Sequence, residues 1–226
     1  MIKEANLVSA TALWQFPDSS LAYKYIVERE FPWEILSDIG SIIADIVRNL
    51  DKDEYRCVDG NVWIANDVKI ANTATVIGPC IIGAGTELRP GAFIRGNVII
   101  GRNAVVGNST ELKNCILFDS VQVPHFNYVG DSILGYRAHM GAGAVTSNVK
   151  SDKSLVCIKV GEDKMATGRK KLGALLGDHV EIGCNSVLNP GTVIGRSSNV
   201  YPLSSVRGVV PSESIYKDKN SIVRKV

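Results

Sequence analysis

An apolar residue recurs at every sixth position through the middle of this sequence. The run has no slip over ten positions, which are Ile64, Ile70, Val76, Ile82, Leu88, Ile94, Ile100, Val106, Leu112 and Phe118. The spacing returns at Leu134 and Met140, and again at Leu176, Ile182, Leu188, Ile194, Val200 and Val206. A period of six fits neither an α-helix nor one long strand, but it suits a short strand followed by a tight corner, repeated.

Three such strands would close one triangular coil. The residue four positions after each aliphatic is usually small or modest, as at Ala74, Cys80 and Thr86, and would fill the interior near a corner. The 21 glycines and the low aromatic content of 7% fit a turn-rich repeat. We therefore predict an all-β solenoid, a parallel β-helix of hexapeptide repeats, over residues 56–212.

Residues 1–55 have a different pattern, and we predict a short helical cap or linker there. Residues 18–20 are suited to start a helix over about 20–30. After Pro32, apolar residues at three- and four-residue steps predict an amphipathic helix over about 33–50. We expect this helix to cover the open end of the solenoid, and packing against a partner chain is the alternative. Residues 213–226 are predicted to be a C-terminal tail.

Residues 146–175 interrupt the hexads. They carry the cations Lys150, Lys153, Lys159, Lys164, Arg169, Lys170 and Lys171. The alternation over 155–160 predicts a strand or hairpin that leaves the coil. A basic excursion from a regular solenoid favours a functional role, and a solvated surface hairpin is the alternative.

Composition excludes several classes of protein. The net charge of +2 gives no reason to expect a nucleic-acid or membrane-surface partner. The five cysteines are scattered without a CxxC pair, so a disulfide scaffold or zinc ribbon is not expected. The N-terminus lacks a signal-peptide pattern and no apolar run is long enough to span a membrane, so we expect a cytoplasmic protein. No P-loop or GxSxG motif supports nucleotide hydrolysis or a serine hydrolase.

The chain has three histidines, His125, His139 and His179, and their wide separations in the sequence do not favour a metal site. His125 lies where the repeat slips, with Tyr128 and Asp131 close by in sequence. A neutral imidazole can take a proton from an attacking amine, so His125 is the candidate general base.

Two cations follow inward aliphatics. Arg89 and Lys113 are separated by one predicted coil plus one further hexad. Cations on adjacent coils could hold a phosphate, and an ordinary charged corner is the alternative.

Several motifs occur in one order along the chain. They are LRPGA at 88–92, ELKN at 111–114, HFNYVGDS at 125–132 and GAGAVTSN at 141–148, followed by GRKKLGA at 168–174 and NPG at 189–191. This set resembles the C-terminal acetyltransferase domain of the bifunctional N-acetylglucosamine-1-phosphate uridyltransferase/glucosamine-1-phosphate acetyltransferase. The last two motifs are most similar to archaeal sugar-1-phosphate nucleotidylyltransferase/acetyltransferases.

The resemblance implies a left-handed coil, against the usual right-handed crossover. It implies an acyltransferase that moves acetyl from acetyl-CoA, as co-substrate, to the amine of an amino-sugar 1-phosphate, without a covalent intermediate or a metal. It also implies a homotrimer. By the matching positions, the base is His125, the substrate-binding residues are Arg89, Lys113, Tyr128 and Asn148, and the acetyl-CoA contacts are Ala142, Gly143 and Lys171.

Departures from the family keep alternatives open. The family usually has an N-terminal nucleotidyltransferase domain with a Gly-rich loop, and this sequence shows no such loop. A separate nucleotidyltransferase would then be a partner, and a uridyltransferase activity inherited from the family name is not expected. Ser154 and Cys157 stand where archaeal relatives have Lys, and His139 stands where bacterial ones have Asn. A non-catalytic sugar-phosphate- or CoA-binding regulatory protein, or a metal-dependent solenoid enzyme, are the remaining hypotheses.

Overall fold

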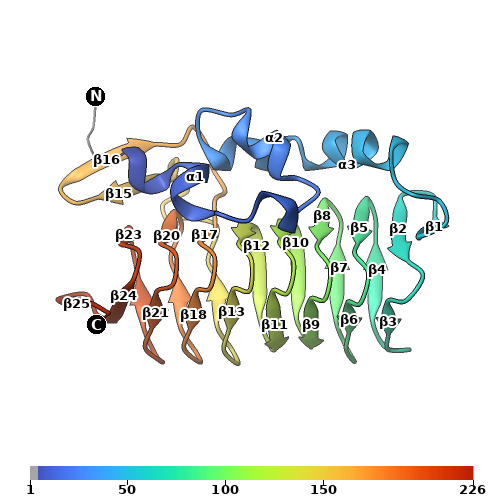
Figure 1. Cartoon of the computed structure of the whole chain (residues 1–226). Coiled ribbons are helices and arrows are strands. Elements are labelled where there is room, and N and C mark those ends of the chain that lie inside the picture. The colour runs from blue at the N-terminus through green and yellow to red at the C-terminus, as the bar shows by residue number, and fades with distance from the viewer. Residues whose placement is uncertain (1–4, 226) are drawn as a thin grey trace.

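The computed structural model describes residues 5–225, so the outermost parts of the predicted cap and tail lie outside the described residues. The chain begins with short helices and continues as a parallel solenoid (Figure 1). The helices are η1 (Ala5–Val8), α1 (Ala10–Leu13), η2 (Pro17–Ser19), α2 (Tyr23–Val27), η3 (Pro32–Ser37) and α3 (Ile39–Arg48). No helix among the described residues is both long enough and apolar enough to cross a membrane.

The solenoid has three faces, each a stack of parallel strands. Face 1 consists of β2 (Val62–Ala65), β5 (Cys80–Ile82), β8 (Val98–Ile100), the second halves of β10 (Glu111–Leu117) and β12 (Tyr128–Leu134), β17 (Ala174–Leu176), β20 (Thr192–Ile194) and β23 (Val209–Val210). Face 2 consists of β4 (Thr75–Ile77), β7 (Phe93–Arg95), the first halves of β10 and β12, β14 (Val145–Thr146), β19 (Val187–Leu188) and β22 (Ser205–Val206). Face 3 consists of β3 (Lys69–Ile70), β6 (Glu87–Leu88), β9 (Val105–Asn108), β11 (Gln122–His125), β13 (His139–Met140), β18 (Glu181–Ile182), β21 (Asn199–Val200) and β24 (Ser214–Asp218).

Antiparallel strands close both ends of the stack. At the start, β1 (Tyr55–Asp59) pairs with β2. At the other end β25 (Ser221–Arg224) folds back on β24, so most of the segment predicted as a tail continues the solenoid. The predicted left-handed parallel β-helix with an N-terminal helical segment is confirmed.

The hexad pattern predicts the core correctly except in the first coil, where Ile70 is exposed and Val76 only partly buried, and near the middle of the chain. Most coils span three full hexads, as shown by the pairing of Ile82 with Ile100. Ile100 then pairs with Leu117, one position short of three hexads. Phe118, the tenth position of the predicted run, is therefore outside the inward row. It is fully buried because Trp14 and Tyr23 pack on it, with ring centroids 5.4 and 6.3 Å away.

Strands of face 1 are apolar on both sides. Each of these strands also has one buried side chain between its two inward residues. These buried side chains are Ile81, Ile99, Ile116, Ile133, Leu175 and Val193. These side chains point outward, yet none exceeds 1% exposure. Uninterrupted apolar triplets such as CII and VII are the expected sequence of strands covered on both faces.

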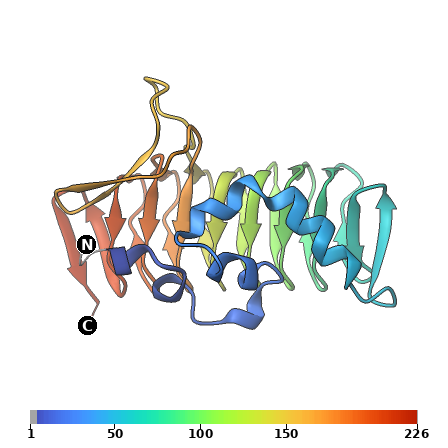
Figure 2. The same cartoon turned by 90° about the horizontal axis from the view of Figure 1, so that it is seen from above.

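The N-terminal helices provide that cover (Figures 1 and 2). Helix α3 contacts β5 and β8, and η3 contacts β12. The amphipathic helix thus lies along face 1, and the prediction that it covers the open end of the solenoid is wrong. Consistently, Ile70 in the first coil stays 38% exposed although it occupies an inward hexad position.

The basic excursion forms the predicted hairpin, with β15 (Cys157–Val160) antiparallel to β16 (Asp163–Ala166). Strand β15 contacts β20 and β23, so the hairpin extends the cover of face 1 toward the C-terminal end.

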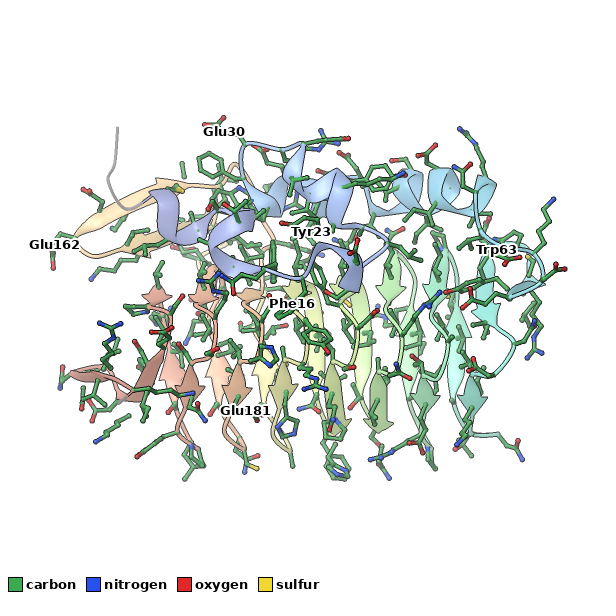
Figure 3. The ribbon with its side chains drawn as sticks, in the orientation of Figure 1. Phe16, Tyr23, Glu30, Trp63, Glu162 and Glu181 are labelled. Carbon is green, nitrogen blue, oxygen red and sulfur yellow. The ribbon has the colours of Figure 1, made fainter. Side chains whose placement is uncertain are left out.

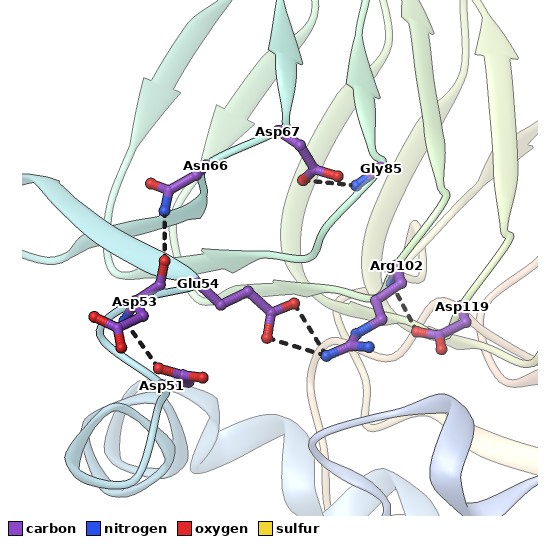
Figure 4. A network of polar contacts seen from close by, with 8 residues as sticks. All are labelled: Asp51, Asp53, Glu54, Asn66, Asp67, Gly85, Arg102 and Asp119. Carbon is purple, nitrogen blue, oxygen red and sulfur yellow. Dashed lines mark hydrogen bonds and ion pairs between the residues drawn. The ribbon is translucent and has the colours of Figure 1, made fainter.

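Polar contacts join the end of the helical segment to the solenoid (Figure 4). Glu54 pairs with Arg102 at 3.1 Å, and the Arg102 backbone N–H donates to Asp119 at 2.7 Å. Nearby, Asn66 donates to the carbonyl of Asp53 at 2.8 Å. The ion pair is partly solvent-exposed, so it contributes little to the stability of the fold.

Close stacking of coils generates a first prediction. A Cβ at Gly107 would lie 1.5 Å from the Pro124 carbonyl oxygen, whereas one at Gly168 would meet nothing within 4 Å. We expect Gly107→Ala to lower the free energy of unfolding by at least about 3 kcal/mol. Gly168→Ala should cost about 1–3 kcal/mol, for its positive φ alone. Denaturant unfolding of both variants checks this, and equal losses would contradict the stacking.

The cysteines give a second prediction. Cys57, Cys157 and Cys184 are exposed, whereas Cys80 and Cys115 are buried. Burial raises the pKa of Cys80 to about 12 and also raises the pKa of Cys115. Because the thiolate is the reactive form, a thiol reagent at pH 8 should modify three cysteines in the folded protein and five in denaturant. Reaction of all five without denaturant would show that face 1 opens readily.

Candidate functional site

The predicted base lies on the corner where face 3 turns into face 2. A ladder of backbone hydrogen bonds follows this corner, from Ser109 N to Pro90 O, Phe126 N to Asn108 O, Gly143 N to His125 O, and Asn185 N to Ala142 O. His125 is therefore stacked directly below Ala142, with Asn108 on its other side. The structure thus brings His125, Ala142 and Gly143 together, and Arg89 lies on the same corner beside Pro90.

The corner holds His125 by its backbone and leaves its imidazole exposed. The His125 N–H donates to Asn127 Oδ1 at 3.1 Å, and the buried Asn127 amide donates to the carbonyls of Gly141 and Ala144 at 2.9 and 3.0 Å. Asn127, which the motif analysis did not single out, therefore joins the HFN and GAGA corners. Phe126 has φ +53° and is 60% exposed, a costly conformation for a bulky residue directly beside the candidate base.

A second group of predicted residues lies on face 2 and at its corner with face 1. The Asn148 Nδ2 group donates to the Tyr128 hydroxyl at 3.2 Å and to Asp131 Oδ2 at 2.6 Å. Asn114 Nδ2 donates to the other oxygen, Asp131 Oδ1, at 2.9 Å. The Tyr128 ring lies over Gly130, where a Cβ would be 2.4 Å from the hydroxyl oxygen. Burial raises the pKa of Tyr128, so its hydroxyl is neutral at pH 7.

The base of the hairpin completes this group. Leu172 N donates to the Asn148 carbonyl at 3.0 Å, and Arg169 Nε donates to the Lys171 carbonyl at 3.2 Å. Lys171, which precedes Leu172, therefore lies close to Asn148 in space, and its side chain is exposed. Burial lowers the pKa of Arg169, while the carboxylates of Asp131 and Asp38 oppose that change.

Arg89 and Lys113 occupy different corners. Arg89 lies on the His125 corner and its Nε is 3.4 Å from Glu87 Oε2. Lys113 pairs in register with Gly130, beside the Tyr128 group. The two cations are thus at opposite edges of face 2 rather than side by side on one corner.

A polar cavity of about 230 Å³ lies near Asn148, whose sequence neighbours Ser147 and Val149 line it although Asn148 itself does not. It is lined by Ser147, Val149, Lys150, Ser151, Asp152, Asn189, Pro190 and Arg207. Lys150 Nζ is 3.4 Å from Asp152, whereas the Arg207 side chain has no ion pair within the described part of the chain. No motif of the sequence points to Arg207, which lies beyond the last of them, NPG at 189–191.

The other histidines lie away from His125. His139 Nδ1 is 2.7 Å from Glu181 Oε2 on face 3, and His179 packs edge-on against Tyr136 and Phe16 (Figure 3, where Phe16 and Glu181 are labelled). Over residues 5–225, no three His, Cys, Asp or Glu side chains come together in a way that could hold a metal ion.

Comparison with known proteins identifies the family to which the chain belongs. The model of the GMPPB C-terminal domain matches residues 76–197. The bifunctional protein GlmU of Methanococcus maripaludis is 33% identical over 197 residues, covering 86% of this chain and 48% of the relative. A bifunctional sugar-1-phosphate nucleotidylyltransferase/acetyltransferase of Sulfurisphaera tokodaii is 32% identical over 174 residues, covering 76% and 43%.

A relative of similar length also matches. The putative uncharacterized acetyltransferase YaiX of Escherichia coli is 29% identical over 210 residues, covering 85% of this chain and 89% of that protein. By contrast, the chain spans about half the length of the two bifunctional relatives. The chain belongs to the family of the GMPPB C-terminal domain, and the similarity to bifunctional sugar-phosphate enzymes that its motifs predict is confirmed.

Proposed function

We propose that this protein is an acetyl-CoA-dependent N-acetyltransferase that acts on an amino-sugar 1-phosphate such as glucosamine 1-phosphate. The observation that carries the proposal is the stacking of His125 on the Ala142–Gly143 corner, through the hydrogen bond from Gly143 N to His125 O at 3.0 Å. The candidate base and two of the candidate acetyl-CoA contacts, Ala142 and Gly143, thereby lie on neighbouring coils. The names of the relatives, several of which are acetyltransferases, agree with this assignment.

The proposed chemistry is direct transfer. The unprotonated ring nitrogen of His125 takes a proton from the sugar amine while the amine nitrogen attacks the thioester carbonyl. A C–N bond forms and the C–S bond breaks, and the proton passes from His125 to the departing CoA thiolate. Backbone N–H groups at the glycine-containing corner would stabilise the oxyanion. This scheme forms no covalent enzyme intermediate and uses no metal.

The two substrates, acetyl-CoA and the sugar phosphate, would contact different sets of residues. The proposed acetyl-CoA contacts are Ala142, Gly143 and Lys171. Arg207, which lines the cavity near Asn148, is a further cation that could bind the phosphates of acetyl-CoA. Tyr128 and Asn148 would contact the sugar. Arg89 and Lys113 would reach the phosphate from the two edges of face 2.

The homotrimer that we propose is consistent with the faces of the solenoid that the chain's own helices and hairpin leave uncovered. Face 1 is covered by residues of the same chain, so faces 2 and 3 are the ones that other copies can contact. The 60% exposed Phe126 beside His125 is suited to burial by such a copy. A separate nucleotidyltransferase is a further proposed partner, because the name of one relative combines nucleotidylyltransferase and acetyltransferase activities. The unpaired cysteines suit the proposed cytoplasmic location.

A non-catalytic binding protein is the second candidate, and one observation favours it. The resemblance to archaeal relatives implies a Lys at the position of Ser154, and the Ser154 hydroxyl contacts Lys150, which is also held by Asp152. A cation engaged in this way holds a substrate phosphate less firmly, which favours binding without the positioning that turnover needs. Such a protein would bind CoA or the sugar phosphate without turnover.

Replacing the base tests the enzyme proposal. We expect His125→Ala to lower kcat for thiol release from acetyl-CoA by at least about 100-fold with glucosamine 1-phosphate as acceptor, since general base catalysis contributes that much. The imidazole is exposed, so the variant should keep the unfolding midpoint and the oligomeric mass of the wild type.

His179→Ala is the matched control, because His179 lies on a different corner and should retain turnover. Normal activity of His125→Ala would exclude the assigned base. Binding of CoA without turnover by the wild type, with glucosamine 1-phosphate and galactosamine 1-phosphate alike, would favour the binding protein.

A further inference from the structure

The candidate site contains a buried carboxylate that the proposed chemistry does not use. Asp131 is 5% exposed, and both of its oxygens accept hydrogen bonds from side-chain amides. Removing a carboxylate from water is costly unless it is well hydrogen-bonded, so the accommodation of Asp131 depends on the amides that donate to it. Its neighbours here are Asn114 and Asn148, and the second of these is a proposed substrate contact.

The carboxylate decides which way the Asn148 amide faces. An ionised carboxylate only accepts hydrogen bonds, so the NH2 group of Asn148 must point toward Asp131. The carbonyl Oδ1 of Asn148 is then the acceptor of this amide, and it has no hydrogen-bond partner in the described chain.

The hydrogen bond between Asn148 and Tyr128 decides whether the Tyr128 hydroxyl acts as a donor or an acceptor toward a ligand. The Tyr128 hydroxyl oxygen accepts from Asn148 Nδ2 at 3.2 Å, which leaves the hydroxyl proton free to donate. Asn148 Oδ1 and the Tyr128 hydroxyl therefore present one acceptor and one donor near each other. A sugar hydroxyl both donates and accepts, so it is the chemical group that satisfies this pair.

The N-terminal segment holds the far side of Asp131. Leu36 O accepts from the same Asn114 Nδ2 group at 3.0 Å, and Ser37 Oγ accepts from Arg169 at 3.2 Å. Arg169 is the cation whose charge interacts with Asp131. Residues 36–37 thus contact both groups that flank the carboxylate, although they lie far from it in the sequence.

We propose that Asp131 is a positioning residue that orients Asn148 and Tyr128 toward one hydroxyl of the acceptor sugar, and that Leu36 and Ser37 hold its surroundings in place. This inference rests on the proposed function and names the recognised part of that substrate. It makes the N-terminal segment part of the site in the same chain, in addition to its role as cover of face 1.

The main test is Asp131→Asn, which keeps the shape but introduces an NH2 group opposite two amide donors. We expect KM for glucosamine 1-phosphate to rise at least tenfold with kcat within about threefold, since the lost contact contributes to binding. The effect should not add to that of Asn148→Ala, because both changes remove the same oriented amide. A purely structural role would lower the unfolding midpoint and kcat while leaving KM unchanged.

Two serines of the N-terminal segment give a matched pair. Ser37 Oγ donates to Glu34 O at 2.9 Å and Ser41 Oγ donates to Asp38 O at 2.8 Å, so both replacements by Ala lose the same kind of local bond. Only Ser37 also accepts from Arg169. We expect Ser37→Ala to raise KM two- to fivefold and Ser41→Ala to leave it unchanged.

The outcomes separate this inference from the proposed function. Turnover by the wild type with an unchanged KM in Asp131→Asn, or additive effects with Asn148→Ala, would overturn the positioning role alone. Calorimetric binding of glucosamine 1-phosphate that is at least tenfold weaker in Asp131→Asn, with no turnover by the wild type, would support the positioning role and refute the transferase. A wild type that neither binds nor acetylates this compound refutes both.

Discussion

The architecture depends on the burial of face 1 from both sides. Its strands carry an inward row and an outward row of aliphatic side chains, and each buried side chain contributes about 1.5–3 kcal/mol. The outward row is covered by α3, η3 and the β15–β16 hairpin, which come from opposite parts of the sequence. This contact attaches the helical segment to the solenoid, and it leaves faces 2 and 3 as the surfaces on which chemistry and assembly can take place.

Covering face 1 also brings the helical segment to the candidate site. Asn114 and Asp131 occupy the corner between faces 2 and 1, both with positive φ. At that corner Leu36 and Ser37 meet the base of the hairpin through Asn114 and Arg169. The same packing that stabilises the solenoid therefore orders the polar groups behind Tyr128 and Asn148. In this chain the contacts that stabilise the fold therefore also hold the residues of the candidate site in place.

The repeat made most of the fold predictable, and its failures have physical reasons. The sixfold period follows from a strand and a corner of fixed length, so the inward row could be read directly. At Phe118 the period fails because one coil is a residue shorter, which shifts the register. Phe118 still fits the apolar pattern because it is buried against Trp14 on the outside of the coil. The apolar stripe predicted one helix over about 33–50, whereas the structure has the 3-10 helix η3 and the α-helix α3, separated at Asp38. An amphipathic stripe also does not say which apolar surface it meets. The triplets CII and VII carried that information, since they are apolar on both faces.

Sequence alone determined the solenoid, its excursion, the family resemblance and the identity of the residues on which the proposed chemistry depends. Those properties follow from local period and from motif order, which need no knowledge of distant contacts. Only the tertiary structure decided that Arg89 and Lys113 lie on different corners and that His125 stacks on Ala142. It also decided that Asp131 joins Asn114, Asn148 and the N-terminal segment. These relations depend on how whole coils stack and on which surface the helices cover, and both are set by long-range packing.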